Sequence, residues 1–83
     1  MNAHLPATQR FPGGYTVSIR EVSAATLRRL ANGADCFGLW YEAKRTIYVD
    51  RAISERKKRY TLAHEMDHAV NDWRHTYCGE DEA

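Results

Sequence analysis

The segment TLAHEMDHAV, residues 61–70, places two of the chain's four histidines four positions apart. Residues with this spacing lie one above the other on the same face of an α-helix, so His64 and His68 can present two imidazole nitrogens to one ion. Glu65 lies one step further round the helix, within reach of a water molecule bound to that ion. The pattern H-E-x-x-H is typical of zinc sites in which the glutamate removes a proton from the bound water. These residues predict a metal centre with its own general base.

A long helix is predicted around this segment. Ser54 is a suitable N-cap, and the helix is expected to run from about Glu55 to Trp73 or beyond. Its apolar positions recur at spacings of three and four residues, as in a helix with one face on a core. These positions are Tyr60, Ala63, Met66, Val70 and Trp73. The histidine pair therefore lies in the helical context that its chemistry requires.

Upstream of the long helix, the sequence predicts a strand followed by a short helix. Residues 15–20 (YTVSIR) alternate apolar and polar side chains, as in a half-buried strand. Ser23 can cap a short helix over residues 24–31, and Asn32-Gly33 ends it.

A hairpin is predicted between the two helices. The β-rich runs FGLWYE (37–42) and TIYVD (46–50) are separated only by AKR. Most of the hairpin's aromatic residues are expected in the core, because a small domain needs large side chains to fill its centre; these are Phe37, Trp40, Tyr41 and Tyr48. An exposed edge strand of this hairpin would be the place for a peptide to bind by strand addition. The expected fold is α+β, with a short helix and a small antiparallel β-sheet packed on the long helix.

The length of 83 residues leaves room for one domain. Residues 1–14 end in Pro12-Gly13-Gly14 and are expected to form a flexible N-terminal arm, so the predicted domain spans residues 15–83. Two cysteines are too few for a secreted disulfide framework, and the N-terminus has no apolar segment of the kind found in secretory signals. A cytoplasmic protein is therefore expected, and nothing in the sequence indicates its oligomeric state.

Charge and hydropathy argue against two classes of partner. The formal net charge of +1 gives no general attraction to nucleic acid or to an anionic membrane, and no apolar run approaches a transmembrane length. The basic run Arg56–Arg59 is expected to be a solvated first helical turn, with nucleic-acid contact as the less favoured interpretation.

The run TIYVDRAISERKKRYTLAHEMDHAV, residues 46–70, resembles the small zincins of the ImmA/IrrE-type and phage-encoded metallopeptidase-like families. The resemblance extends from Phe37 to Val70 and rests on the order of elements: a hairpin strand ending in an acidic residue, a capped turn, a basic first helical turn and a TLAHE segment. It implies a gluzincin-like fold, Zn²⁺ as cofactor and hydrolysis of peptide bonds. His64 and His68 would then be metal ligands, and Glu65 the general base.

A catalytic zinc needs a third protein ligand and an open position. The downstream donors are Asp72, His75, Cys78, Glu80, Asp81 and Glu82. Asp72 and His75 would lie too far along a straight helix, whereas a turn near residues 76–79 would fold the acidic tail back to the ion. The resembling families also take their third ligand from a glutamate after such a turn. Glu80 is therefore the favoured ligand, with Glu82 next, and His75 and Cys78 remain open.

Two functions are compatible with these residues. The first is a zinc metallopeptidase that binds a peptide or protein substrate along the hairpin edge. The second is a catalytically inactive zincin-like domain that binds a protein partner. The intact Glu65 favours the first, whereas the short C-terminal segment after His68 and the acidic Asp67 favour the second.

Overall fold

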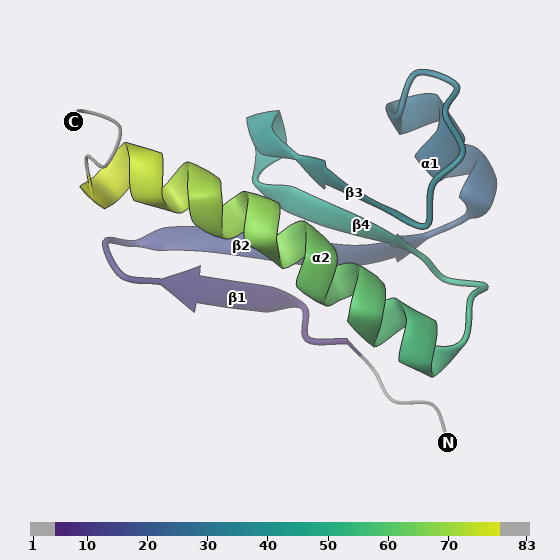
Figure 1. Ribbon diagram of the computed structural model, residues 1–83, viewed down its shortest axis with the longest axis horizontal. Helices are drawn as coiled ribbons and strands as arrows, with labels where there is room; N and C mark the ends of the chain where they lie inside the picture. Colours follow the sequence, from purple (N-terminus) through teal and green to yellow (C-terminus); the bar gives the residue numbers. More distant parts are fainter. Residues whose placement is uncertain (1–4, 79–83) are drawn as a thin grey trace.

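The structure is a computed structural model that describes residues 5–78, with side chains described through residue 76. Its elements are β1 (Thr8–Phe11), β2 (Tyr15–Val22), α1 (Ala24–Leu30), β3 (Gly38–Tyr41), β4 (Thr46–Asp50) and α2 (Glu55–Trp73), with short helical turns η1 (Glu42–Lys44) and η2 (Arg74–Cys78). Figure 1 shows α2 lying across one face of the four-stranded sheet. The α+β fold class predicted from the sequence is confirmed.

The sheet is mixed, with strand order β1-β2-β4-β3. The outer pairs β1–β2 and β3–β4 are antiparallel, but the central strands β2 and β4 run parallel, with Ile19 opposite Ile47. The prediction of an antiparallel sheet is therefore wrong for the central pair. The parallel pairing arises because β3 begins, after α1, at the end of the sheet where β2 finishes and runs back along it. The second strand of the hairpin, β4, therefore runs in the same direction as β2.

Residues 8–11 form strand β1, where the sequence analysis placed a flexible arm. This strand pairs with β2, with Phe11 opposite Tyr15, and Leu5 and Phe11 pack against the core. The three polar residues of the segment Thr8–Phe11 are exposed, so the strand lacks the apolar alternation that identifies half-buried strands. Residues 1–4 of the expected arm lie outside the described residues.

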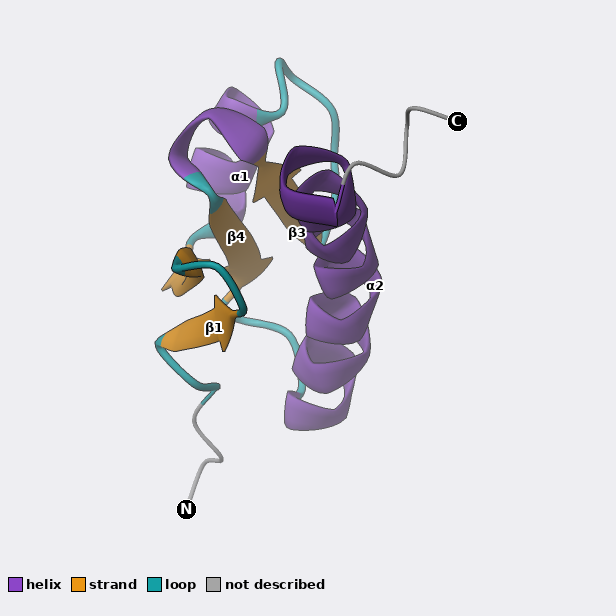
Figure 2. Ribbon diagram, turned by 90° about the vertical axis from the view of Figure 1, so that its left-hand side faces the viewer, coloured by secondary structure: helices purple, strands orange, loops and turns teal. Residues whose placement is uncertain are grey.

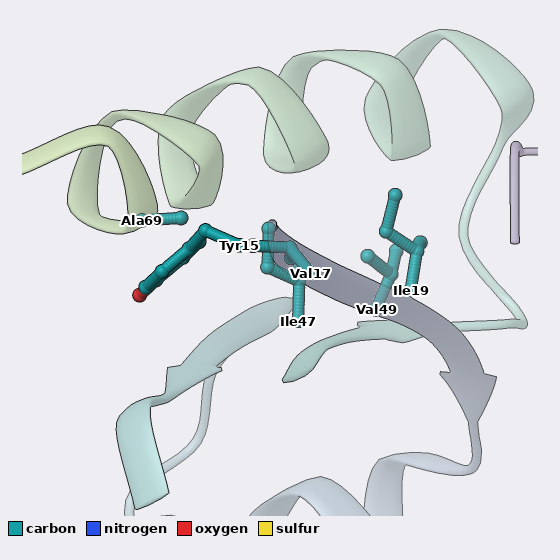
Figure 3. Packing of buried hydrophobic residues seen from close by; sticks show 6 residues of the cluster. All are labelled: Tyr15, Val17, Ile19, Ile47, Val49 and Ala69. Atoms are coloured by element: carbon teal, nitrogen blue, oxygen red, sulfur yellow. The ribbon is translucent and has the colours of Figure 1, made fainter. Parts of the chain in front are cut away.

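The core lies between the sheet and α2. Alternate residues of the two central strands lie on the face that α2 covers, and all are buried; Figure 3 shows the side chains of Ile19 and Val49 pointing toward the helix, with the ring of Tyr15 extending away from it. This cluster consists of Tyr15, Val17, Ile19, Ile47 and Val49 with Ala69 of α2. Helix α1 lies on the side of the sheet away from α2 (Figure 2), where Leu27 is fully buried.

Helix α2 has the predicted bounds, and the Ser54 side chain accepts a hydrogen bond from Lys57 N at 3.2 Å. Its buried face differs from the predicted one. Tyr60 is 75% exposed and Ala63 is exposed, so neither belongs to the packed face. The residues that contact the core are Leu62, Met66, Ala69 and Trp73. Because apolar residues occur on several sides of this helix, the spacing alone fits more than one face, and packing on the sheet selects one of them.

The short helix and its end follow the sequence closely. Ser23 Oγ accepts from Thr26 N at 3.1 Å, which caps α1. Asn32 and Gly33 both have positive φ (56° and 92°), the left-handed conformation that ends a helix. Within residues 5–78, no helix combines the length and the apolar character needed to cross a lipid bilayer.

Candidate metal centre and the adjoining pocket

His64 and His68 lie side by side on the exposed surface of α2. Their ring centroids are 5.4 Å apart, and the ring planes meet at 82°. Two imidazoles that share a tetrahedral zinc ion, with Zn–N bonds of about 2.0–2.1 Å, have centroids roughly 5 Å apart. The spacing of the two rings therefore fits a shared ion.

Glu65 lies one step round the helix from the histidines, on the side that faces β3. Its side chain is half-buried, and its Cγ lies 3.4 Å from the point where a Cβ on Gly38 would stand. The aliphatic part of the Glu65 side chain thus rests against the beginning of β3. Glu65 therefore lies next to the two exposed histidines but is more buried than they are.

A pocket of about 340 Å³ opens beside this part of α2. It is lined by Cys36, Phe37 and Gly38 from the start of β3, and by Lys57, Tyr60, Thr61, His64 and Glu65 from α2. His64 and Glu65 therefore form part of a concave surface.

The aromatic residues of the hairpin are less buried than the sequence analysis expected. Phe37 is 50% exposed, and Lys57 Nζ lies 4.4 Å from the centroid of its ring. Trp40, Tyr41 and Tyr48 are half-buried. The core prediction is wrong for Phe37, because Gly38 has no side chain and lets α2 lie close to the strand, which leaves Phe37 at the margin of the contact.

Among the strands of residues 5–78, β3 pairs with β4 alone and so forms an edge of the sheet. Asp50 N donates to Phe37 O at 2.9 Å, so the main-chain groups of Phe37 face β4. Because these directions alternate along an antiparallel strand, the main-chain groups of Gly38 and Trp40 face away from β4. The hairpin thus has the edge strand that the sequence analysis considered as a peptide-binding element.

Cys36 is a free cysteine in the pocket lining, and its thiol is half-buried. Burial raises the pKa of this thiol above its usual value, and the negative charge of Glu65 raises it further, whereas a hydrogen bond from Gly38 N–H acts in the opposite direction. In the metal-free protein the side chain is therefore a neutral thiol near neutral pH. In the sequence, Cys36 carries one signal of this location, its position just before the predicted hairpin.

Among the described residues, no group of three histidine, cysteine, aspartate or glutamate side chains is placed to hold a metal ion. Asp72 Oδ2 accepts a hydrogen bond from Trp40 Nε1 at 2.5 Å, and His75 Nδ1 lies 2.7 Å from Asn71 O. Asp72 and His75, two of the candidate metal ligands downstream of His68, thus each contact another residue.

The acidic tail is the other source of a third ligand. Glu80 and Glu82 lie outside the described residues, as does the side chain of Cys78. The assignment of Glu80 to the metal stays a prediction.

The basic run at the start of α2 is divided between two surfaces. Lys58 Nζ forms an ion pair with Glu21 Oε1 at 2.7 Å, and both side chains are largely covered, at 13% and 28% exposure. Arg56, Lys57 and Arg59 are exposed. The basic run therefore makes a structural contact through Lys58, and its other three residues are solvated.

Comparison with family models, with curated proteins and with solved structures gave no match for this chain. A functional assignment therefore depends on the residues and the geometry described above.

Proposed function

We propose that this protein is a zinc-dependent metallopeptidase of the H-E-x-x-H type. One observation carries the proposal: two exposed imidazoles stand 5.4 Å apart on α2, and the glutamate between them in sequence lines a pocket at an edge strand. Hydrolysis of a peptide bond by this chemistry uses two nitrogen ligands, an adjacent base and an edge for an extended chain, together with a third metal ligand.

His64 and His68 would hold the ion, with Glu80 as the proposed third ligand and Glu82 as the next choice. When bound, zinc supplies a Lewis acid for the scissile carbonyl and lowers the pKa of water to about 7.

Glu65 supplies the proton transfers in this proposal. It accepts the proton of the attacking water and then donates it to the leaving nitrogen. Its half-buried stem, held beside Gly38, fixes the carboxylate between the histidine pair and the edge of β3. A substrate strand along β3 would therefore bring its backbone past the carboxylate.

The substitution Glu65→Gln tests this role. The amide keeps the shape of the side chain but cannot take a proton, so zinc content should be retained while turnover of a peptide library falls by about 10²–10⁴-fold. Asp67→Asn, an exposed change on the same helix, is the matched control and should leave turnover unchanged. Loss of zinc in Glu65→Gln would make Glu65 a ligand, and unchanged turnover would remove it from the mechanism.

The third ligand has a separate test. Glu80→Ala should weaken zinc binding by roughly 10–100-fold if Glu80 completes the ligand set, whereas Glu82→Ala should have a much smaller effect. Equal zinc affinity in the parent protein and in Glu80→Ala would refute the assignment.

A second candidate function is a zincin-like domain that binds a protein partner without cleaving it. It is favoured by the pocket and the edge of β3, which need no metal to bind a peptide. Selective peptide binding by zinc-loaded protein with no cleavage at all would support this function.

We also propose a cytoplasmic location. Cys36 is a free thiol, as expected for a protein kept in a reducing compartment.

A further inference from the structure

A second hollow adjoins the pocket beside Glu65. Its volume is about 270 Å³, and it is lined by Ser54, Arg56, Lys57 and Tyr60. Lys57 and Tyr60 line both hollows, so the two adjoin along the first turns of α2. We name the two hollows together the α2 groove.

The α2 groove has opposite charges at its two ends. Glu65 stands at one end, and Arg56 and Lys57 stand at the other. Eight residues separate Lys57 from Glu65, which corresponds to about 12 Å along a helix axis. Between these ends lie the exposed rings of Phe37 and Tyr60, which give the middle of the groove its apolar surface, and Lys57 Nζ reaches to 4.4 Å from the centroid of the Phe37 ring.

The direction of β3 determines how an added strand would run through the groove. Phe37, just before β3, lies against Lys57 near the start of α2, whereas Trp40 donates its hydrogen bond to Asp72 near the end. An antiparallel strand on the β3 edge would therefore run from Trp40 toward Phe37. Its C-terminal part would approach Lys57.

We propose that the α2 groove selects extended peptides in which a large apolar residue is followed, two positions later, by aspartate or glutamate. The proposal rests on the proposed function, because the groove would be the substrate site of the peptidase. Side chains two positions apart lie on the same face of a strand, roughly 6.6 Å from each other. The apolar side chain occupies the first hollow, against Phe37 and Tyr60, and the carboxylate then reaches the second hollow between Arg56 and Lys57.

Charge complementarity favours an acidic peptide over the other classes of ligand. Arg56 and Lys57 are exposed and attract a carboxylate, while Glu65 disfavours one at the opposite end. Nucleic acid would need a longer cationic track, but Lys58 faces Glu21 on the other side of the helix. The wide apolar lining supplied by Phe37 and Tyr60 also fits a side chain better than a phosphate.

The test is peptide binding to zinc-loaded Glu65→Gln protein, in which binding is measured without cleavage. Three fluorescent peptides differ only in a central Leu-Ala-Glu, Ala-Ala-Glu or Leu-Ala-Lys. The first should bind about tenfold more tightly than the second, because the leucine side chain is removed from water. It should bind about three- to tenfold more tightly than the third, and this preference should shrink as salt is added.

Two variants and a control locate the effect. Lys57→Glu should reverse the preference between the Glu and Lys peptides, and Tyr60→Ala should reduce the preference for leucine over alanine. Arg59→Glu is the control, because Arg59 is exposed on the same helix but lines neither hollow. Absence of the leucine preference, or a reversal produced equally by Arg59→Glu, would overturn the proposal.

Two further outcomes separate this inference from the proposed peptidase. Selective binding with no cleavage by the unmodified protein would remove the peptidase and keep the groove. Cleavage of all three peptides at the same rate would remove the groove's specificity and keep the peptidase. A single-stranded oligonucleotide that binds more tightly than the Leu-Ala-Glu peptide, in a manner weakened by Lys57→Glu, would assign the surface to nucleic acid and overturn the proposal.

Discussion

Thr61 of α2 packs directly against Gly38, the first residue of β3, and leaves no space for a side chain at position 38. A Cβ there would clash with Thr61 Cγ2 and would stand 3.2 Å from Tyr48 O. Thr61 is buried and lies one helical turn before Glu65. This contact therefore fixes the separation between the edge strand and the part of the helix that carries the candidate site.

Gly38→Ala should lower the free energy of unfolding by about 1–3 kcal/mol, the usual cost of adding a methyl group to a filled contact. Chemical denaturation with urea measures the change.

Thr61→Ser provides the matched partner for a double-mutant cycle, because it removes the methyl group that the new Cβ would meet. Alone it should destabilise the protein, since a buried methyl is lost. Combined with Gly38→Ala it should recover part of the loss, with a coupling of about 0.5–3 kcal/mol. Additive effects of the two substitutions would contradict the close contact.

The hydrogen bond from Trp40 Nε1 to Asp72 Oδ2 joins β3 to α2 one turn beyond His68. Trp40→Phe should lower the unfolding free energy by about 1–3 kcal/mol, because a hydrogen bond to a charged group is lost. Asp72→Asn keeps an oxygen that can accept the bond and should cost less. Zinc titration of both variants should give the parent affinity; a loss of affinity in Asp72→Asn alone would make Asp72 the third ligand.

The ion pair between Lys58 and Glu21 should contribute to stability, whereas the exposed residues of the basic run should contribute little. Lys58→Met should lower the unfolding free energy by about 1–3 kcal/mol, because it leaves a largely covered carboxylate without its partner. Arg59→Met, at an exposed position in the same run, should change it by less than about 0.5 kcal/mol. Equal effects of the two substitutions would show that the pair has no special role.

Cys36 should react slowly with alkylating agents near neutral pH, because burial and the charge of Glu65 hold its thiol pKa above the usual value. In metal-free protein with Cys78→Ser, alkylation should accelerate as the pH rises. Glu65→Gln removes one of the causes of the shift, so it should lower the pKa of Cys36 and speed the reaction at a given pH. A rate profile unchanged by Glu65→Gln would mean that the two side chains do not interact.

Capping residues made the helix bounds predictable from sequence. Ser23 and Ser54 accept the hydrogen bonds expected of N-caps, and Asn32 with Gly33 takes the left-handed conformation that ends α1. These signals are local, so they depend little on the rest of the fold. The hairpin is also local and was predicted for the same reason.

Other features depend on long-range packing, which a pattern of residue types does not specify. The parallel pairing of β2 with β4 joins strands more than 20 residues apart, as in Ile19 with Ile47. The face of α2 that packs on the sheet includes Leu62 and Ala69, whereas the predicted face had Tyr60 and Ala63. The sequence fits both faces because α2 carries apolar residues on several of its sides. Strand β1 was missed since its residues are mostly polar and exposed.

The sequence predicted the histidine pair on its helix and an edge strand in the hairpin, but not the pocket between them. The spacing of His64 and His68 places their rings together wherever a helix forms, as found. The pocket beside Glu65 was not predictable, because Cys36, Phe37 and Gly38 reach it through the tertiary contact between β3 and α2.

The metal content of the purified protein tests the central claim most directly. After dialysis, elemental analysis of the parent protein should give about one zinc ion per chain, the stoichiometry of a single catalytic site. The His64→Ala, His68→Ala double variant should lose the ion and keep its helical circular dichroism, because both side chains are exposed and neither packs on the core. A zinc content unaffected by the double substitution would contradict the account.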